Sequence, residues 1–437
     1  MRHVLFDRML PPQWTVTNVD SIKANEKSAC VAGPFGSDIS SKYFVTDGVP
    51  VIRGSNLTDD LTRFVPENFV FVSPDRATAY KAQHVRAGDL VFTCWGTIGQ
   101  VGLIPARGPF PEYIISNKQL KLRPDTNVAD SLYLFYYFAS PQMVGHIRNR
   151  AIGAAVPGIN LGILKALEVV LPPLKVQRRI ASILSAYDDL IENNTRRIAI
   201  LEEMARRIYE EWFVRFRFPG HENVRMVESE LGLVPEGWPV TAASTAIYIN
   251  PKTKVAKDGL KPFVAMNCLS DRSMLISEPE QRSGNSGSKF QNGDTLFARI
   301  TPCLENGKTG FVQFLPEGDT AFGSTEFIVL RSRTLAPEFV YLLARSESFR
   351  NKAIKSMSGA SGRQRVRDAC FDAFLLPHPD NTTTSLFAEK VQPMFRLIQA
   401  LAMKNTNLRT TRDLLLPKLI SGELDVSALP EPEACAA

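Results

Sequence analysis

The clearest pattern along the chain is a four-three spacing of apolar residues in two separate stretches. Between residues 180 and 212, nine of the ten positions at this spacing are apolar, and between residues 387 and 419 eight of ten are. Bulk composition would place roughly four apolar residues in each set. Surface helices rarely hold such a register for so long, and a coiled coil or helix bundle does. The sequence therefore predicts two long helices that pack against each other.

The exceptions in these two sets are polar residues at inward-facing positions. The first set contains Asn194, and the second contains Asn405 and Arg412. If the two helices run antiparallel, the fifth position of the first faces the sixth of the second, so Asn194 lies opposite Asn405. A buried amide pair in an apolar interface fixes the alignment of two helices. The alternative is that both asparagines lie at a solvated edge of the interface.

Outside the helices, the chain repeats itself at a spacing of about 205 residues. The Gly-Asp turn Ala87-Gly88-Asp89 precedes a hydrophobic strand, and Asn292-Gly293-Asp294 does the same in the second half. Three further pairs keep the same order: 132–140 with 339–346, 153–158 with 358–362, and the proline-terminated strands 167–173 with 371–379. Each half is therefore predicted to be a mixed domain followed by a long helix, an α+β fold with a pseudo-two-fold repeat.

Composition fits a multidomain globular protein. A chain of 437 residues, 44% hydrophobic and 22% charged, exceeds one ordinary core. The six cysteines are scattered without a C-x-x-C pair, which favours free thiols in a reducing compartment. Arg2, Asp7 and Arg8 interrupt the apolar start, so it cannot serve as a secretion signal, and we expect a cytoplasmic protein. The net charge of +6 is spread out and allows DNA binding without requiring it.

The motifs of common enzymes do not occur in the chain. An amino-methyltransferase needs a glycine-rich cofactor loop and an Asn/Asp-Pro-Pro-aromatic turn, but both Pro-Pro pairs follow leucine. Gly307-Lys308-Thr309 resembles the end of a phosphate-binding loop, yet Pro302 stands where that motif needs glycine. The five histidines show no metal-ligand spacing. We therefore predict no catalytic, cofactor-binding or metal-binding residue.

Several segments resemble those of one known family, the specificity subunits of Type I restriction-modification systems. They are 171–181 (LPPLKVQRRIA), 191–194 (IENN), 212–220 (WFVRFRFPG), 415–424 (LLPKLISGEL) and 33–37 (GPFGS). The resemblance covers residues 10–425 and includes the alternation of domain and helix. One departure is the second helical region, which has Leu376-Pro377-His378-Pro379 and a polar run in place of the usual entry. Together with Pro393, this leaves the start of the second helix open.

The resemblance implies five segments. These are 1–171 for the first target recognition domain, 172–218 for the first conserved helical spacer, 219–379 for the second target recognition domain, 380–422 for the second conserved helical region, and 423–437 for a flexible C-terminal tail. It also implies a non-catalytic subunit that binds double-stranded DNA, two modification (methyltransferase) subunits and restriction (translocase and endonuclease) subunits. Cofactors would then belong to the partners, which use S-adenosylmethionine, ATP and Mg.

Two different domains held apart by rigid helices suit a bipartite, asymmetric DNA site. A helix of 32 steps spans roughly 50 Å, or about 14 base pairs. Bases are read by loop donors and acceptors, while Lys and Arg bind phosphates. The predicted DNA-binding residues occupy matching places in the repeat: Arg148, Asn149 and Arg150 in the first domain, and Ser361, Arg363, Gln364, Arg365 and Arg367 in the second, with Arg299 and Thr301 after the repeated strand. Any one of these arginines could instead be a solvated surface charge.

Two alternatives come from other functional classes. The chain could be a scaffold whose coiled-coil arms hold two protein-binding domains, or a stand-alone DNA enzyme. The missing catalytic motifs count against the enzyme, and the paired basic loops are unexplained by the scaffold. A scaffold would have no sequence-specific affinity for DNA, even with its partners present.

Overall fold

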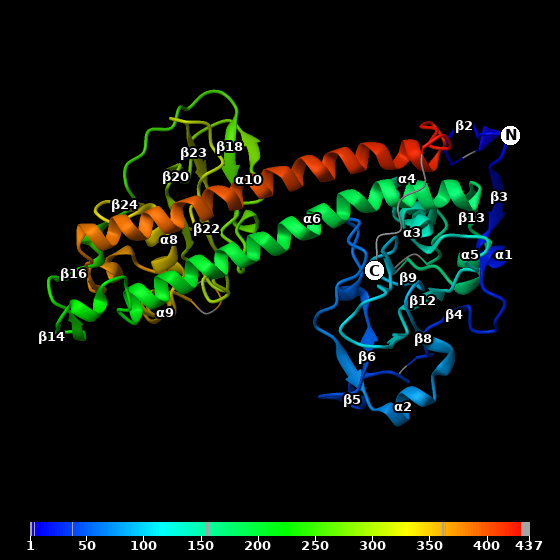
Figure 1. The fold of residues 1–437 in the computed structure, drawn as a ribbon, viewed down its shortest axis with the longest axis horizontal. Coiled ribbons are helices and arrows are strands. Elements are labelled where there is room, and N and C mark those ends of the chain that lie inside the picture. The colour runs from blue at the N-terminus through cyan, green and yellow to red at the C-terminus, as the bar shows by residue number, and fades with distance from the viewer. Residues whose placement is uncertain are drawn as a thin grey trace. The chain divides into compact units, whose positions relative to one another are not determined.

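The computed structural model describes residues 2–3, 5–36, 38–153, 157–360, 362 and 364–429. Its contacts divide the chain into two units, residues 1–191 with 407–437 and residues 192–406. Each unit holds one mixed domain of strands and short helices together with a stretch of both long helices (Figure 1). Within the described residues, every helix is too short or too polar to cross a membrane.

The two predicted long helices are α6 (Leu174–Tyr209), which a π-helical turn extends over Glu210–Val214, and α10 (Asn381–Ile420). Each is a continuous ribbon in Figure 1, α6 in green and α10 in orange to red. In the second unit, Asn194 contacts Asn405 and the ring of Trp212 lies 6.0 Å from that of Phe387. The helices therefore run antiparallel, which confirms the predicted coiled coil.

Helix α10 begins at Asn381 without the family's usual entry sequence, and Asp380 caps its N-terminus instead. Asp380 precedes the helix and accepts hydrogen bonds from the backbone N–H of Thr383 (2.9 Å) and from the indole Nε1 of Trp238 (3.0 Å). A side chain that accepts from the third helical N–H is an ordinary N-terminal cap. The helix then continues through Pro393, so this proline does not mark its beginning.

The first domain contains two sheets. One has the order β10-β9-β12-β4 and the other β5-β7-β6-β11-β8, in which β6 and β11 are parallel. The strands are β4 (Cys30–Ala32), β5 (Phe44–Val45), β6 (Val49–Ile52), β7 (Val70–Val72), β8 (His84–Val85), β9 (Leu90–Thr93), β10 (Val101–Leu103), β11 (Tyr113–Ile115) and β12 (Gln119–Leu122). The remaining elements of this unit are β1 (Arg2–His3), β2 (Arg8–Met9), β3 (Thr15–Asn18), α1 (Val19–Ile22), α2 (Pro74–Thr78), α3 (Ser131–Ala139), α4 (Pro141–Asn149), α5 (Leu161–Ala166) and β13 (Glu168–Leu171).

The second domain repeats this plan, except that edge strand β5 of the first domain has no counterpart. Its sheets have the orders β22-β21-β24-β17 and β19-β18-β23-β20, and β18 and β23 are parallel as β6 and β11 are. The strands are β17 (Ile247–Ile249), β18 (Lys261–Val264), β19 (Glu280–Arg282), β20 (Ser288–Gln291), β21 (Thr295–Ala298), β22 (Thr309–Phe311), β23 (Thr320–Gly323) and β24 (Phe327–Ser332). Around them are β14 (Met226–Ser229), β15 (Gly232–Pro235), β16 (Val240–Ala242), α7 (Ala243–Ala246), α8 (Pro337–Arg345), α9 (Glu347–Lys355) and β25 (Leu375–Pro377). The predicted α+β class and internal repeat are confirmed.

Each domain shares its core with its own stretch of the helix pair. In the first unit, α3 is apolar on nearly all sides and packs in one cluster with Ile180 and Leu184 of α6 and with Leu416 of α10. Its buried tyrosines still find acceptors, because the hydroxyl of Tyr133 donates to the carbonyl of Val170 at 2.8 Å. In the second unit, α8 packs likewise against both helices. Burying one apolar face of each helix against a domain stabilises helices of this length.

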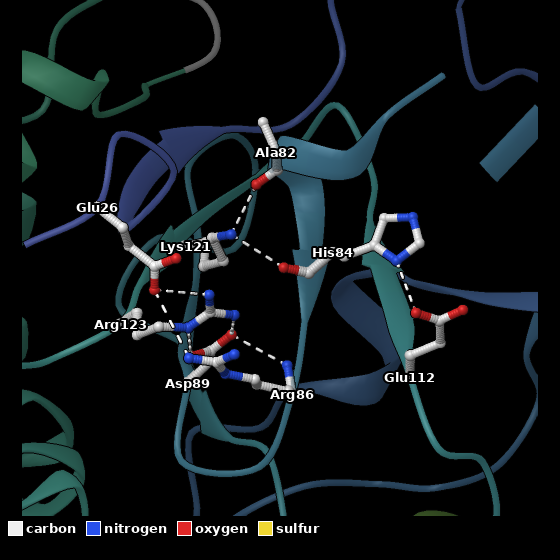
Figure 2. A network of polar contacts seen from close by, with 8 residues as sticks. All are labelled: Glu26, Ala82, His84, Arg86, Asp89, Glu112, Lys121 and Arg123. Carbon is white, nitrogen blue, oxygen red and sulfur yellow. Dashed lines mark hydrogen bonds and ion pairs between the residues drawn. The ribbon is translucent and has the colours of Figure 1, made fainter. Parts of the chain in front are cut away.

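The repeated Gly-Asp turn is fixed by a buried ion pair in each domain. Both carboxylate oxygens of Asp89 accept from Arg123, from Nε at 2.7 Å and from Nη2 at 2.6 Å (Figure 2). Both oxygens of Asp294 accept from Arg331 in the same way, at 2.6 and 2.7 Å. Such two-point contacts are directional as well as strong. The turn that revealed the repeat in the sequence is therefore part of the shared scaffold.

The first domain adds a second buried cation beside this pair. Lys121 donates to the carbonyl oxygens of Ala82 (2.6 Å) and His84 (2.9 Å), as Figure 2 shows. Burial disfavours the charged amine and lowers the pKa of Lys121 to about 8. The register of the strands places Val329 at the equivalent position of the second domain, where it is apolar and buried.

Candidate nucleic-acid interface

In the first domain, three chain segments meet at one edge of the sheet. Strands β4 and β9 both pair antiparallel with β12, so both end at the edge where β12 begins. The loops that follow β4 and β9, and Asn117 and Lys118 before β12, form what we call the first strand-end face. Its loops are held in place, because Asn117 Nδ2 donates to the carbonyl of Gly36 at 2.8 Å.

Two aromatic side chains are exposed on this face. Phe35, in the loop after β4, is 92% exposed, and Trp95, directly after β9, is 41% exposed. The backbone of Trp95 forms a β-bridge with Gly158, and a Cβ at Gly158 would lie 2.3 Å from the indole ring. Glycine is therefore required there, since any side chain would displace the ring.

The predicted cluster Arg148, Asn149 and Arg150 lies at the end of α4, and all three are exposed. Arg148 Nε donates to the carbonyl of Ile98 at 3.2 Å, in the loop that continues from Trp95. This bond brings the end of α4 to the loop after β9. The contact of these residues with DNA stays a prediction.

The second domain has an equivalent strand-end face, formed by the loops after β17 and β21 and the segment before β24. It contains an open pocket, and the side chains that line it include two lysines and one arginine. The polar and charged lining residues are Asn250, Lys252, Thr253, Ser288, Lys289, Arg299 and Thr325. Basic and amide groups are thereby gathered on a concave surface, which suits phosphate and base contacts.

Several predicted residues of the second domain make contacts within the protein. Arg299 donates to the carbonyl of Val366 at 2.6 Å and lies 3.4 Å from Asp368. Thr301 donates to Glu305 at 3.1 Å, and Arg367 Nε donates to the hydroxyl of Ser358 at 3.0 Å. The carbonyl of Gln364 accepts from the backbone N–H of Thr301, which joins the two predicted loops. Ser361 and Arg363 lie outside the described residues.

Arg365 makes the most hydrogen bonds of these residues, all of them to Glu326. Its Nη2 lies 2.7 Å from one oxygen of Glu326, and its Nε bonds both oxygens of the same carboxylate. The hydrogen bonds from Arg365 lower the pKa of Glu326, so that the carboxylate is charged. Because this charge offsets that of Arg365, the exposed Lys252 is a better candidate for contact with a phosphate.

Four residues of the two faces were missed by the sequence reasoning, Phe35, Trp95, Lys252 and Lys289. Phe35 stood inside the GPFGS segment that carries the family resemblance, and Trp95 is a large aromatic beside Gly96 after a buried strand. Both signals were present, but an exposed ring cannot be told from a core ring by spacing. Lys252 and Lys289 come together only through the fold.

On the helices, the structure brings Asn194 and Asn405 together within the second unit. Asn194 Nδ2 donates to Asn405 Oδ1 at 2.8 Å, and each residue is 3% exposed. This geometry is the buried amide pair rather than a solvated edge. That the pair fixes the helix alignment stays a prediction, which unchanged pairing and stability after replacing both residues with leucine would contradict.

Among the described residues, no group of three or more His, Cys, Asp or Glu side chains is arranged so that it could hold a metal ion.

Comparisons with known proteins agree with this architecture. Residues 37–203 match the family described as the Type I restriction modification DNA specificity domain. The chain is 25% identical over 436 residues to the Type I restriction enzyme MjaIX specificity subunit of Methanocaldococcus jannaschii, covering 96% of this chain and 95% of the relative. It is 33% identical over 156 residues to the EcoEI specificity subunit of Escherichia coli, covering 34% of this chain and 26% of the relative.

Along most of its length the chain is similar to Type I restriction-modification specificity subunits, and residues 37–203 match the family model of their DNA specificity domain. The solved structure of such an S subunit from M. genitalium aligns with a TM-score of 0.54 at 14% identity, covering 93% of this chain and 96% of that one. This likeness supports the same fold.

Proposed function

We propose that this specificity subunit reads a bipartite, asymmetric DNA site, one half with each strand-end face, and performs no catalysis itself. The observation that carries the proposal is the repetition of one scaffold with two different faces. The sheets and the buried Asp–Arg pairs recur. The exposed loop residues differ between the two domains. At the position where the first domain has Trp95, the second domain has Ile300. Two faces that share a scaffold but differ in their exposed residues are suited to two half-sites of different sequence.

The long helices are proposed to dock the modification and restriction subunits. Within the second unit, Ile200 and Met204 of α6 and Met403 of α10 are exposed large apolar residues. Ile200 and Met204 are one turn apart and therefore lie on the same side of their helix. A partner subunit that covered this side of α6 would remove both side chains from water, which favours association. S-adenosylmethionine, ATP and Mg would then be bound by the partner subunits.

The decisive experiment is co-expression with the modification subunit of the same system, followed by mapping of methylated adenines across the host genome. We expect a split motif with a fixed gap between its halves. No new methylation by a stable complex with an intact partner would contradict the proposal and favour the scaffold alternative. That scaffold would also show no preference between a chosen DNA site and random DNA.

A further inference from the structure

Each recognition domain is bonded to its stretch of the helix pair by a loop at the same place in the repeat. In the first unit this loop contains Asp60 and Arg63, and the Arg63 carbonyl accepts from the N–H of Leu103 in edge strand β10 at 2.8 Å. In the second unit it contains Ser273 and Met274, and the Met274 carbonyl accepts from Phe311 in edge strand β22 at 2.9 Å. We call these two segments the helix-contact loops.

In the first unit, arginines make the contact. Arg63 Nη2 of the loop lies 2.9 Å from Asp189 of α6. Arg412 of α10, almost fully buried, forms an ion pair with Asp188 of α6 and donates to the carbonyl of Asp60 at 3.4 Å. The hydroxyl of Tyr136 on α3 also donates to Asp188. The loop is thus bonded to both long helices, and the domain helix α3 is bonded to α6.

In the second unit, a carboxylate makes the contact. Oε1 of Glu202 on α6 accepts from the hydroxyl of Ser273 at 2.7 Å and from the backbone N–H of Met274 at 2.8 Å. Beside it, the ring of Tyr341 on α8 packs against Phe395 of α10 at 5.7 Å between ring centroids. The two hydrogen bonds to Glu202 are directional, whereas ring packing tolerates sliding.

We propose that the helix-contact loops are positioning elements for DNA recognition, with Glu202 and Arg63 as their central residues. They hold each domain at one angle on its helices and thereby restrict the gap between half-sites. This inference rests on the proposed bipartite recognition. One added base pair shifts a half-site by about 3.4 Å and turns it by about 35°. A domain can follow that turn only by rotating on its helices, which the bonds of Glu202 and Arg63 oppose.

Glu202 offers a matched set of variants. Glu202→Ala removes the acceptor of both bonds. Glu202→Gln keeps an Oε1 oxygen that can accept both, so it should restore the native behaviour. Glu203→Ala is the control, because this neighbouring carboxylate is more exposed and pairs only along the helix surface with Arg206 and Arg207. Ser273→Ala, which deletes one donor, is a milder second variant should Glu202→Ala fail to fold.

The measurement is methylation by the complete complex with the modification subunit, on duplexes that carry the mapped motif with its native gap or a gap one base pair longer or shorter. We expect Glu202→Ala to lower the preference for the native gap by about tenfold. Glu202→Gln and Glu203→Ala should keep the wild-type preference. Arg63→Ala should lower it as Glu202→Ala does.

An unchanged preference in both Glu202→Ala and Arg63→Ala would overturn the inference, as would an equal loss in Glu203→Ala. Loss in Glu202→Gln equal to that in Glu202→Ala would also overturn it, because charge rather than the two bonds would then be responsible. If the wild-type complex methylates no split motif, the proposed function fails instead, and the two failures are distinguishable.

Discussion

The two recognition domains have the same scaffold but different chemistry at their strand-end faces. The first exposes the rings of Phe35 and Trp95. The second gathers Lys252, Lys289 and Arg299 around an open pocket. The order of the strands that the two domains share and the buried Asp–Arg pair do not differ, although the first domain has the additional edge strand β5. The comparison teaches that the repeated positions are those that packing requires, and that the positions which differ are those that packing leaves open.

The largest expected effect comes from removing a scaffold residue that the domains share. Arg331→Ala leaves the carboxylate of Asp294 buried without its partner, and we expect the free energy of unfolding of that domain to fall by about 3–5 kcal/mol. Arg123→Ala should act alike in the first domain. Urea denaturation checks both. Arg282→Ala, in an exposed pair with Glu280, is the control, and a loss as large there would refute this account.

A second prediction concerns Phe35 and Trp95, the exposed aromatic residues of the first strand-end face. Phe35→Ala and Trp95→Ala should each weaken specific DNA binding of the complex by between about five-fold and 100-fold, as expected for lost contacts between rings and bases. Because no charge is removed, the salt dependence of binding should stay the same. Fluorescence anisotropy over a salt series measures both quantities. Leu260→Ala, at an exposed apolar position of the other domain, should change neither.

A third prediction concerns Lys252 and Lys289 on the strand-end face of the second domain. Here we expect the salt dependence of DNA binding to change. Lys252→Ala and Lys289→Ala should each reduce the slope of log affinity against log salt by about one, with a smaller loss of affinity that is similar for specific and random DNA. The same anisotropy series tests this. An unchanged slope would show that these lysines do not contact phosphates.

The smallest predicted effect concerns Lys121, which the second domain replaces with Val329. The folded pKa of about 8 lies below the ordinary value of 10.5, so the unfolded chain binds more protons between these values. Lys121 should therefore contribute a rise in the free energy of unfolding across this window, by at most about 1.4 kcal/mol per pH unit. The buried thiols of Cys30 and Cys94, whose pKa burial raises to about 11, contribute a fall above pH 9 in the wild type and in the variant alike. Urea titrations at pH 8 and 10 should therefore show a smaller rise, or a larger fall, in Lys121→Val than in the wild type, and an identical pH dependence in both would contradict the assignment.

Much of the fold could be predicted because the signals are local and periodic. The apolar spacing of α6 and α10 and the Gly-Asp turns followed by hydrophobic strands are visible without any tertiary information. Even the opposition of Asn194 and Asn405 follows from the register once the helices are taken as antiparallel. The sequence left the start of α10 open because of Pro393 and the unusual segment 376–379, and the structure begins the helix at Asn381, directly after the capping residue Asp380.

The candidate site was only partly predictable. Clusters of Arg, Asn and Gln mark loops that are suited to DNA, but spacing does not reveal which charges are already compensated. Arg365 is paired with Glu326, and Arg299 lies beside Asp368. The exposed rings of Phe35 and Trp95 read in the sequence like ordinary core residues, since a single aromatic carries no periodicity.

The sequence by itself determined the two helices, the repeat and the family, because each is written as a pattern over tens of residues. Only the tertiary structure decided which loops share a face, since strands β4 and β9 meet at one edge only through their pairing with β12. It also decided which polar groups bond each domain to its helices. Glu202 and Ser273 are 71 residues apart, and only folding brings their side chains within hydrogen-bond distance.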